Sequence, residues 1–155
     1  MKLNLGCSDR FRTGYLNVDK FRPYGVVDSH EFRQVDLAEP WPWDSSSITE
    51  IVADDIIEHL PNKIFTMNEI HRVLVPGGTA HIFVPTTDGR GAWQDPTHVS
   101  YWNRGSFLYF TKGVAEYERF HETYGITGCF RVVEESMSEY PGSVSKLTIV
   151  LEAVK

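Results

Sequence analysis

Short apolar runs alternate with polar segments in the first half of the chain, and each run predicts a β-strand. Four of them span residues 2–5, 15–18, 32–35 and 50–53; a glycine follows the first and an acidic residue follows each of the others. Residues 79–85, TAHIFVP, are typical of a buried strand. Two further strands are predicted at about residues 127–134 and 144–150, and YPGS between them is short enough for a hairpin.

The segment PNKIFTMNEIHRVLVPGG, residues 61–78, has the spacing of an amphipathic helix. Its apolar positions form one stripe: Ile64, Met67, Ile70, Val73 and Leu74. Pro61 suits the first turn, and the Pro-Gly-Gly sequence at residues 76–78 ends the helix. A short helix is also predicted around residues 106–110. Strands that alternate with crossovers predict an α/β domain over residues 1–155, with a mostly parallel sheet of about seven strands, covered on both faces, and an antiparallel last strand.

Composition indicates the cellular compartment of the protein and the classes of partner that it can bind. The 155 residues are 41% hydrophobic and 23% charged, as in a single globular domain. The two cysteines, Cys7 and Cys129, form no disulfide framework, which favours a reducing, cytoplasmic setting. We expect no membrane association, because no apolar run reaches the length of a bilayer span and no signal-peptide pattern opens the chain. A net charge of −6 disfavours nucleic acid as a partner.

The residues that follow the strands point to a nucleoside ligand. In an open α/β sheet, ligands bind at the carboxyl ends of the strands. The residues there combine one glycine turn with acidic positions: Gly6, Cys7, Ser8, Asp19, Asp36, Leu37, Asp54 and Asp55. Carboxylates can accept hydrogen bonds from ribose hydroxyls, an exocyclic amine or an ammonium group, but they suit a diphosphate poorly. The dinucleotide fingerprint needs glycine at positions 8 and 11, where Ser8 and Phe11 stand, which disfavours an NAD-dependent oxidoreductase.

Several segments together resemble class I S-adenosylmethionine-dependent methyltransferases, over roughly residues 2–85. LNLGCSDR is similar to that family's first motif, with Asn4 in place of the acid and Ser8 in place of the second glycine. GYLNVDKF, VDLAEPWPWDSSSITEIVADDIIEHL and NEIHRVLVPGGTAHIFVP resemble the segments that follow. DPTHVSYWNRGSFLYF resembles a subset of these enzymes associated with sugar or surface-polysaccharide modification.

The resemblance implies a Rossmann-like three-layer sandwich and S-adenosyl-L-methionine as the cofactor. It assigns cofactor contacts to the first motif (Asn4, Gly6, Cys7 and Ser8), the ribose to Asp19 and the adenine to Asp36 and Leu37. One of Asp54 and Asp55 would face the methionine half. Trp43 is read either as a cover for the adenine or as a core side chain.

The sequence departs from the family in two ways. Only 12 residues separate Gly6 from Asp19, so the first helix must be a turn or absent. No residues precede Met1 to form the helices that usually cover the cofactor, so we expect an incompletely covered site that a second subunit, in a homodimer, could complete. Ser8 fits the loop if its φ is negative.

The long segment at residues 86–102 is the candidate for substrate chemistry, because loops of this length in a compact domain are usually functional or mobile. His98 could act as a general base oriented by Asp95; alternatively, Asp95 caps a turn and His98 forms local hydrogen bonds.

Arg90 and Arg104 either hold an anionic acceptor or are solvated. Glu58 and His59 form either an acid–base pair or a packing contact. The histidines lack zinc-like spacing with the cysteines, so no metal site is predicted.

These observations favour S-adenosylmethionine-dependent methyl transfer to a small-molecule or glycan acceptor. A hydroxyl acceptor needs a base, and histidine suits that role. The alternative is a non-catalytic binding or regulatory module that retains the methyltransferase fold.

Overall fold

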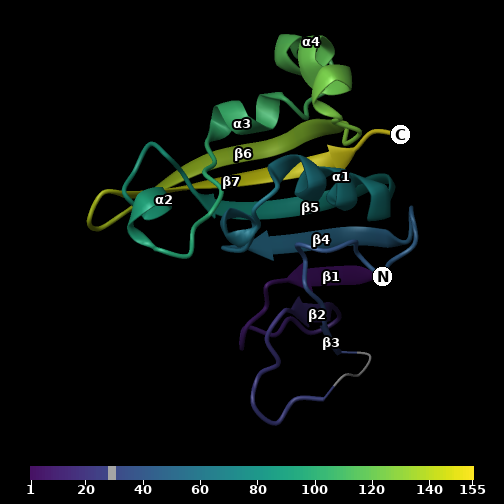
Figure 1. Ribbon diagram of the computed structural model, residues 1–155, viewed down its shortest axis with the longest axis vertical. Coiled ribbons are helices and arrows are strands. Elements are labelled where there is room, and N and C mark those ends of the chain that lie inside the picture. Colours follow the sequence, from purple (N-terminus) through teal and green to yellow (C-terminus); the bar gives the residue numbers. More distant parts are fainter. Residues whose placement is uncertain (28–30) are drawn as a thin grey trace.

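The computed structural model describes residues 1–27 and 31–155 and contains a seven-stranded sheet with the order β3-β2-β1-β4-β5-β7-β6 (Figure 1). The strands are β1 (Lys2–Leu5), β2 (Leu16–Asp19), β3 (Phe32–Gln34), β4 (Ile48–Asp54), β5 (Leu74–Pro85), β6 (Phe130–Tyr140) and β7 (Val144–Ala153). Neighbouring strands from β3 to β5 run parallel, and β7 runs antiparallel to both β5 and β6. The predicted seven strands, the β6–β7 hairpin and the reversed last strand are confirmed.

The helices agree less closely with the sequence prediction. They are η1 (Ile57–His59), α1 (Lys63–Val73), α2 (Gly91–Gln94), α3 (Arg104–Leu108) and α4 (Ala115–Tyr124). The side chain of Asn62 caps α1 by accepting from the Phe65 N–H, so the placement of Pro61 in the first turn was wrong: it lies before the cap. α3 begins two residues before the predicted start, and α2 and α4 were not predicted. None of the described helices is long and apolar enough to cross a bilayer.

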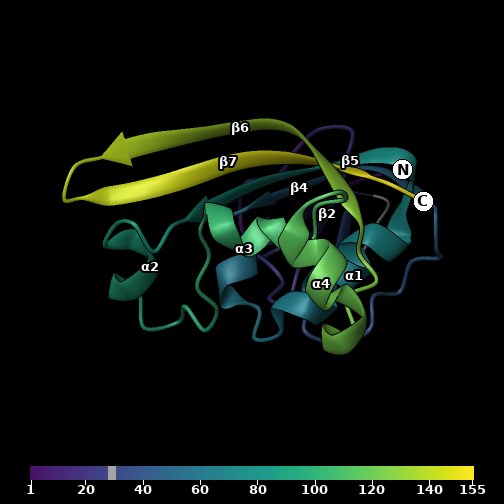
Figure 2. The ribbon, with the colours of Figure 1, turned by 90° about the horizontal axis from the view of Figure 1, so that it is seen from above.

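The two faces of the sheet differ sharply in polarity. One face carries buried apolar side chains in register across five strands: Leu3, Leu5, Val18, Ile51, Ala53, Ala80, Ile82, Val84, Leu147, Ile149 and Leu151. The labelled helices lie against this face (Figure 2). The opposite face carries mainly polar or charged side chains, among them Lys2, Asn4, Asn17, Glu50, Thr79, His81, Thr148 and Glu152.

The chain length between the first strands explains this difference. Only ten residues join β1 to β2, whereas a parallel crossover usually takes a dozen or more with its helix. The expected absence of the first helix is confirmed, and a loop passes over the polar face instead (Figure 2). The Rossmann-like sheet is therefore as predicted, but over β1 and β2 this face is covered by a loop rather than by a helix.

Two buried asparagines hold that loop. Asn4 donates from Nδ2 to Asn17 Oδ1 at 2.8 Å and to the Arg10 carbonyl at 3.0 Å. Asn17 Oδ1 also accepts from the Arg12 N–H at 2.8 Å, and its Nδ2 donates to the Glu31 carbonyl at 3.0 Å. Side-chain amides thus satisfy backbone groups that a helix would otherwise pair internally.

We expect Asn17→Ala to lower the free energy of unfolding by about 2 kcal/mol, because it removes the buried oxygen that accepts from the Arg12 N–H and from the Asn4 amide. Urea unfolding of the full chain measures this loss. The control is Gln94→Ala at an exposed side chain, which should change the stability by less than about 0.5 kcal/mol. Equal stabilities of the two variants would contradict the role of the asparagine pair.

Candidate functional site

The turn after β1 is built around a glycine that no other residue could replace without strain. Gly6 has φ +63°, and a Cβ placed there would lie 2.6 Å from the Ile56 side chain. The Cys7 N–H then donates to the Val18 carbonyl at 3.0 Å, which keeps the turn against the end of β2. Gly6 therefore lets the β1 turn approach the segment after β4 closely.

Ser8 adopts a conformation that the sequence did not predict. Its φ is +47° rather than negative, a left-handed conformation that costs a non-glycine residue roughly 1–2 kcal/mol. The Ser8 N–H donates to Asp19 Oδ2 at 2.8 Å, and the other oxygen of Asp19 accepts from the Phe21 N–H at 2.9 Å. Asp19 thus ties the β1 turn to the chain that follows β2.

A cleft of about 660 Å³ opens at the carboxyl ends of these strands, within the size range of small-molecule sites. Its lining includes six of the nine predicted cofactor residues: Gly6, Ser8, Asp19, Asp36, Leu37 and Asp55. Apolar side chains from other segments complete it, namely Phe21, Val35, Ile56, Leu60 and Val99. We call this cavity the main cleft.

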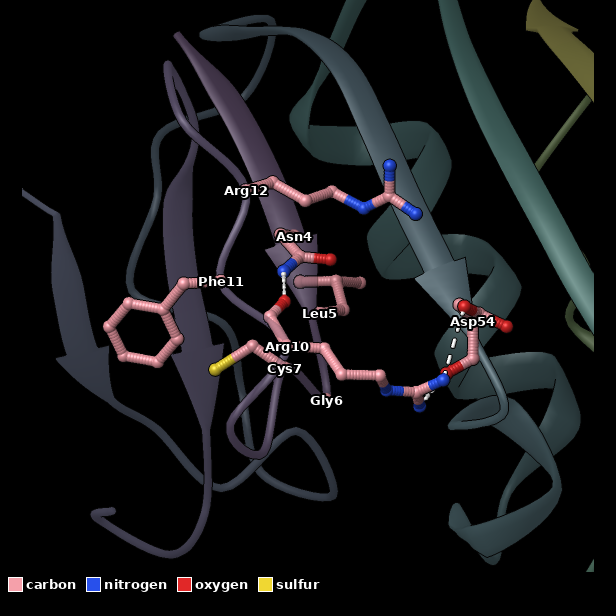
Figure 3. Close-up of a pocket in the computed structure, with 8 residues that line it drawn as sticks. All are labelled: Asn4, Leu5, Gly6, Cys7, Arg10, Phe11, Arg12 and Asp54. Atoms are coloured by element: carbon pink, nitrogen blue, oxygen red, sulfur yellow. Dashed lines mark hydrogen bonds and ion pairs between the residues drawn. The ribbon is translucent and has the colours of Figure 1, made fainter. Parts of the chain in front are cut away.

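The other three predicted cofactor residues, Asn4, Cys7 and Asp54, line an adjoining cavity of about 270 Å³ beside the β1 turn, which shares Gly6 and Arg10 with the main cleft (Figure 3). Arg10 crosses this cavity and donates to Asp54 Oδ2 and to the Asp54 carbonyl, both at 3.3 Å. The amide of Asn4 is committed to the loop described above. Asp54 is the last residue of β4, and Asp55 after it, not Asp54, lines the main cleft.

The three predicted acids Asp36, Asp54 and Asp55 each have a cationic partner. Lys20 lies 2.7 Å from Asp36 Oδ2, and this contact, with the Ala38 N–H, holds the pKa of Asp36 below its usual value. Lys146 of β7 pairs with Asp55, and Arg10 pairs with Asp54. The main cleft is consequently less negative than its row of acids suggests, and a bound ligand would share or replace these partners.

A third cavity, of about 210 Å³, adjoins the main cleft, and Asp55 and His59 line both. We call it the side cavity; Glu58, Asp95, His98 and Lys146 also line it. Glu58 is 2% exposed, and burial raises the pKa of its carboxyl group to about 8. A protonated carboxyl and two histidines thus lie beside the cleft, where proton transfer is chemically feasible.

The predicted pair Asp95 and His98 lies in the side cavity. Its contacts include features of a base with an orienting acid and features of a turn-capping acid with a locally bonded histidine. His98 Nε2 is 3.9 Å from Asp95 Oδ2 and 4.0 Å from Glu58 Oε1, and His98 Nδ1 lies 3.1 Å from the Ala92 carbonyl. Asp95 Oδ1 accepts from the N–H and the hydroxyl of Thr97, as a turn-capping acid does. The Ala92 carbonyl orients the His98 ring, and Asp95 adds a nearby negative charge.

The arginine and tryptophan candidates lie outside the main cleft and the side cavity. Arg104 pairs with Glu135 at 2.7 Å, and neither Arg104 nor Arg90 lines the main cleft or the side cavity. Trp43 is a core side chain that packs edge-on against Trp41. Sequence reasoning missed Lys146, which reaches the site from β7; the IIEHL segment signalled Glu58, but not its burial.

No protein-family model and no curated protein sequence matches the chain. Solved structures do match it. An S-adenosylmethionine-dependent methyltransferase of Methanosarcina mazei has a TM-score of 0.66 and 11% identity, covering 99% of this chain and 92% of that one. The Burkholderia thailandensis 1,6-didemethyltoxoflavin-N1-methyltransferase, solved with S-adenosylhomocysteine, has a TM-score of 0.64 and 14% identity, covering 99% and 71%.

The [4+2]-cyclase SpnF matches almost as well, with a TM-score of 0.62, 12% identity and coverage of 99% and 74%. The chain therefore has the fold of class I S-adenosylmethionine-dependent methyltransferases, as the resemblance implied. Because a cyclase shares this fold, the reaction has to be argued from the site.

We expect Gly6→Ala to destabilise the protein more than Gly14→Ala. Both glycines have positive φ, where alanine costs roughly 1–2 kcal/mol. Only at Gly6 would the new Cβ collide with Ile56, because nothing lies within 4 Å of a Cβ at Gly14. Urea unfolding measures the loss in free energy of unfolding for each variant. Equal losses would show that Ile56 does not pack tightly against residue 6.

Cys7 should resist thiol reagents in the folded protein. Burial, and then the charge of Asp19, raise the pKa of its thiol to about 11, so roughly one in a thousand molecules carries the thiolate at pH 8. With a chromogenic disulfide reagent at pH 8, the folded Cys129→Ser variant, which keeps only Cys7, should release almost no coloured thiolate until urea is added. The Cys7→Ser variant should release it in the folded state, because its remaining thiol, Cys129, is partly exposed. Rapid release from folded Cys129→Ser would contradict this assignment.

Proposed function

We propose that this protein transfers a methyl group from S-adenosyl-L-methionine to a hydroxyl of a small-molecule or glycan acceptor. The observation that carries the proposal is the main cleft: residues that follow β1, β2, β3 and β4 line one cavity of about 660 Å³. The side cavity opens beside it and carries groups that can accept a proton. The fold shared with the methyltransferases above supports the same reading.

The main cleft suits an adenosyl group. Each oxygen of Asp19 accepts a hydrogen bond from one backbone N–H and keeps a further lone pair, which can accept a hydrogen bond from a ribose hydroxyl group. Asp36 is ionised and can accept from the exocyclic amine of adenine. Leu37 and the exposed ring of Phe21 offer apolar contact to a purine. Asp55 lies where the main cleft meets the side cavity and would face a cationic sulfur.

When bound, S-adenosyl-L-methionine supplies a methyl group that its positively charged sulfur already activates. The protein then has to bind and align the acceptor and remove its proton. We assign the side cavity to the acceptor hydroxyl and proton acceptance to His98 Nε2. The Ala92 carbonyl holds the ring by accepting from Nδ1–H, and Asp95 Oδ2 lies 3.9 Å from Nε2.

Calorimetric titration with S-adenosylhomocysteine tests cofactor binding. We expect saturable binding to the wild type, and a 10- to 100-fold higher Kd for Asp36→Asn and Asp19→Asn, because each removes a charge-assisted hydrogen bond. The control is Asp88→Asn, an exposed acid outside the cleft, which should bind like the wild type. Failure of the wild type to bind would overturn the proposal.

Methyl transfer is then followed as release of S-adenosylhomocysteine with panels of hydroxyl acceptors. We expect His98→Asn to lose turnover at least 100-fold while its affinity for S-adenosylhomocysteine stays within about twofold, because His98 does not line the main cleft. Binding without turnover for every acceptor class would favour the non-catalytic module instead.

A further inference from the structure

Three potential metal ligands meet in the side cavity, although they are distant in the sequence. Glu58 and His59 are neighbours in η1, and His98 belongs to the long segment after β5. One ligand atom from each lies within 4.8 Å of those of the other two. The backbone fixes this arrangement, because the Glu58 carbonyl accepts from the N–H groups of Val99 and Ser100 at 2.9 and 3.0 Å. These bonds hold the His98 segment against η1.

Glu58 provides an independent indication that this cluster has a ligand. Its side chain is 2% exposed, and neither of its carboxyl oxygens has a hydrogen-bond partner among the described residues. Burial of an unpaired carboxyl group is costly, and such groups usually have a partner. Lys146, which also lines this cavity, is paired with Asp55. A bound cation would supply the partner that the protein leaves out.

Both histidines are held in the tautomer that binds metal through Nε2. His98 Nδ1 lies 3.1 Å from the Ala92 carbonyl, which can only accept, so Nδ1 carries the proton. His59 Nδ1 lies 3.2 Å from the Thr97 carbonyl and 3.1 Å from the Thr97 hydroxyl, which gives its own hydrogen to Asp95. Histidine ligands of metals usually donate their second N–H to a carbonyl or carboxylate in this way.

We propose that Glu58, His59 and His98 bind one divalent transition-metal ion, of which Zn²⁺ is the representative. Two imidazoles and one carboxylate suit Zn²⁺, Fe²⁺ or Co²⁺ rather than Mg²⁺ or Ca²⁺, which prefer oxygen ligands. Bonds of about 2.1 Å would draw the ligand atoms to roughly 3.4 Å apart, a small closure of side chains. Three protein ligands leave one position open, as in catalytic zinc sites.

The existence of this site does not depend on methyl transfer, but its role does. If the proposed function holds, the open position binds the acceptor oxygen, and the ion lowers the pKa of the hydroxyl group there. His98 is then a ligand and no longer the base, and the proton of the hydroxyl group passes to solvent water. The metal-free and metal-bound proteins therefore use the same three side chains differently.

The test is metal binding by the full chain after treatment with EDTA and dialysis. Zn²⁺ is titrated calorimetrically, and Co²⁺ is followed by its visible absorption. We expect one equivalent to bind with a Kd in the micromolar range or lower. Glu58→Gln and His98→Asn should each weaken Zn²⁺ binding at least 10-fold, and His59→Gln provides a third variant should one of these fail to fold. His121→Gln is the control, because His121 lies on α4 outside the cluster.

Absence of saturable binding to the wild type would overturn the proposal, as would binding that Glu58→Gln and His98→Asn leave unchanged. An equal loss in His121→Gln would also overturn it, since it would indicate adventitious binding to surface histidines. Titration of the same variants with S-adenosylhomocysteine separates the two proposals, because Glu58 and His98 do not line the main cleft. Loss of Zn²⁺ with S-adenosylhomocysteine binding retained is the expected pattern.

Discussion

The buried hydrogen bond between Asn4 and Asn17 is the interaction on which the cleft end of the molecule depends. It joins β1 to β2 and fixes the loop that takes the place of a crossover helix. With that loop in place, Gly6 can turn against Ile56, and Asp19 can pair with the Ser8 N–H. A small polar network thus does what a packed helix does in longer α/β units: it sets the position of the β1 turn.

Local patterns were sufficient to predict much of the fold. β1, β4, β5, β7 and α1 have apolar spacing that burial in the structure follows, whereas β6 has one buried residue, Phe130. α4 was missed although Tyr117, Phe120 and Tyr124 have helical spacing, because none of its residues is fully buried and aromatic residues do not favour a helix. Ser8 was misjudged for a different reason: its left-handed φ is accompanied by a hydrogen bond to Asp19, a residue eleven positions away. Such bonds are visible only after the strands have been placed.

The site was predictable only in part, for a similar reason. The order of strands and acids identified six lining residues of the main cleft, because the ends of parallel strands meet at one edge. It could not show that Lys20 and Lys146 balance two of those acids, since both pairs form between separate segments. Nor could it show that Glu58 is buried beside His98, forty positions away. Spacing along the sequence identifies side chains that are close in the chain and misses clusters that the fold assembles.

Both exposed edges of the sheet are poorly suited to pairing with another strand. β3 has three residues, and the outer strand β6 has a register irregularity between Val132 and Glu134. Three glutamates, Glu134, Glu135 and Glu139, also lie on β6. Short or charged edges oppose the edge-to-edge association through which open sheets polymerise. The irregularity and the glutamates therefore oppose the pairing of another strand along the outer edge of the β6–β7 hairpin.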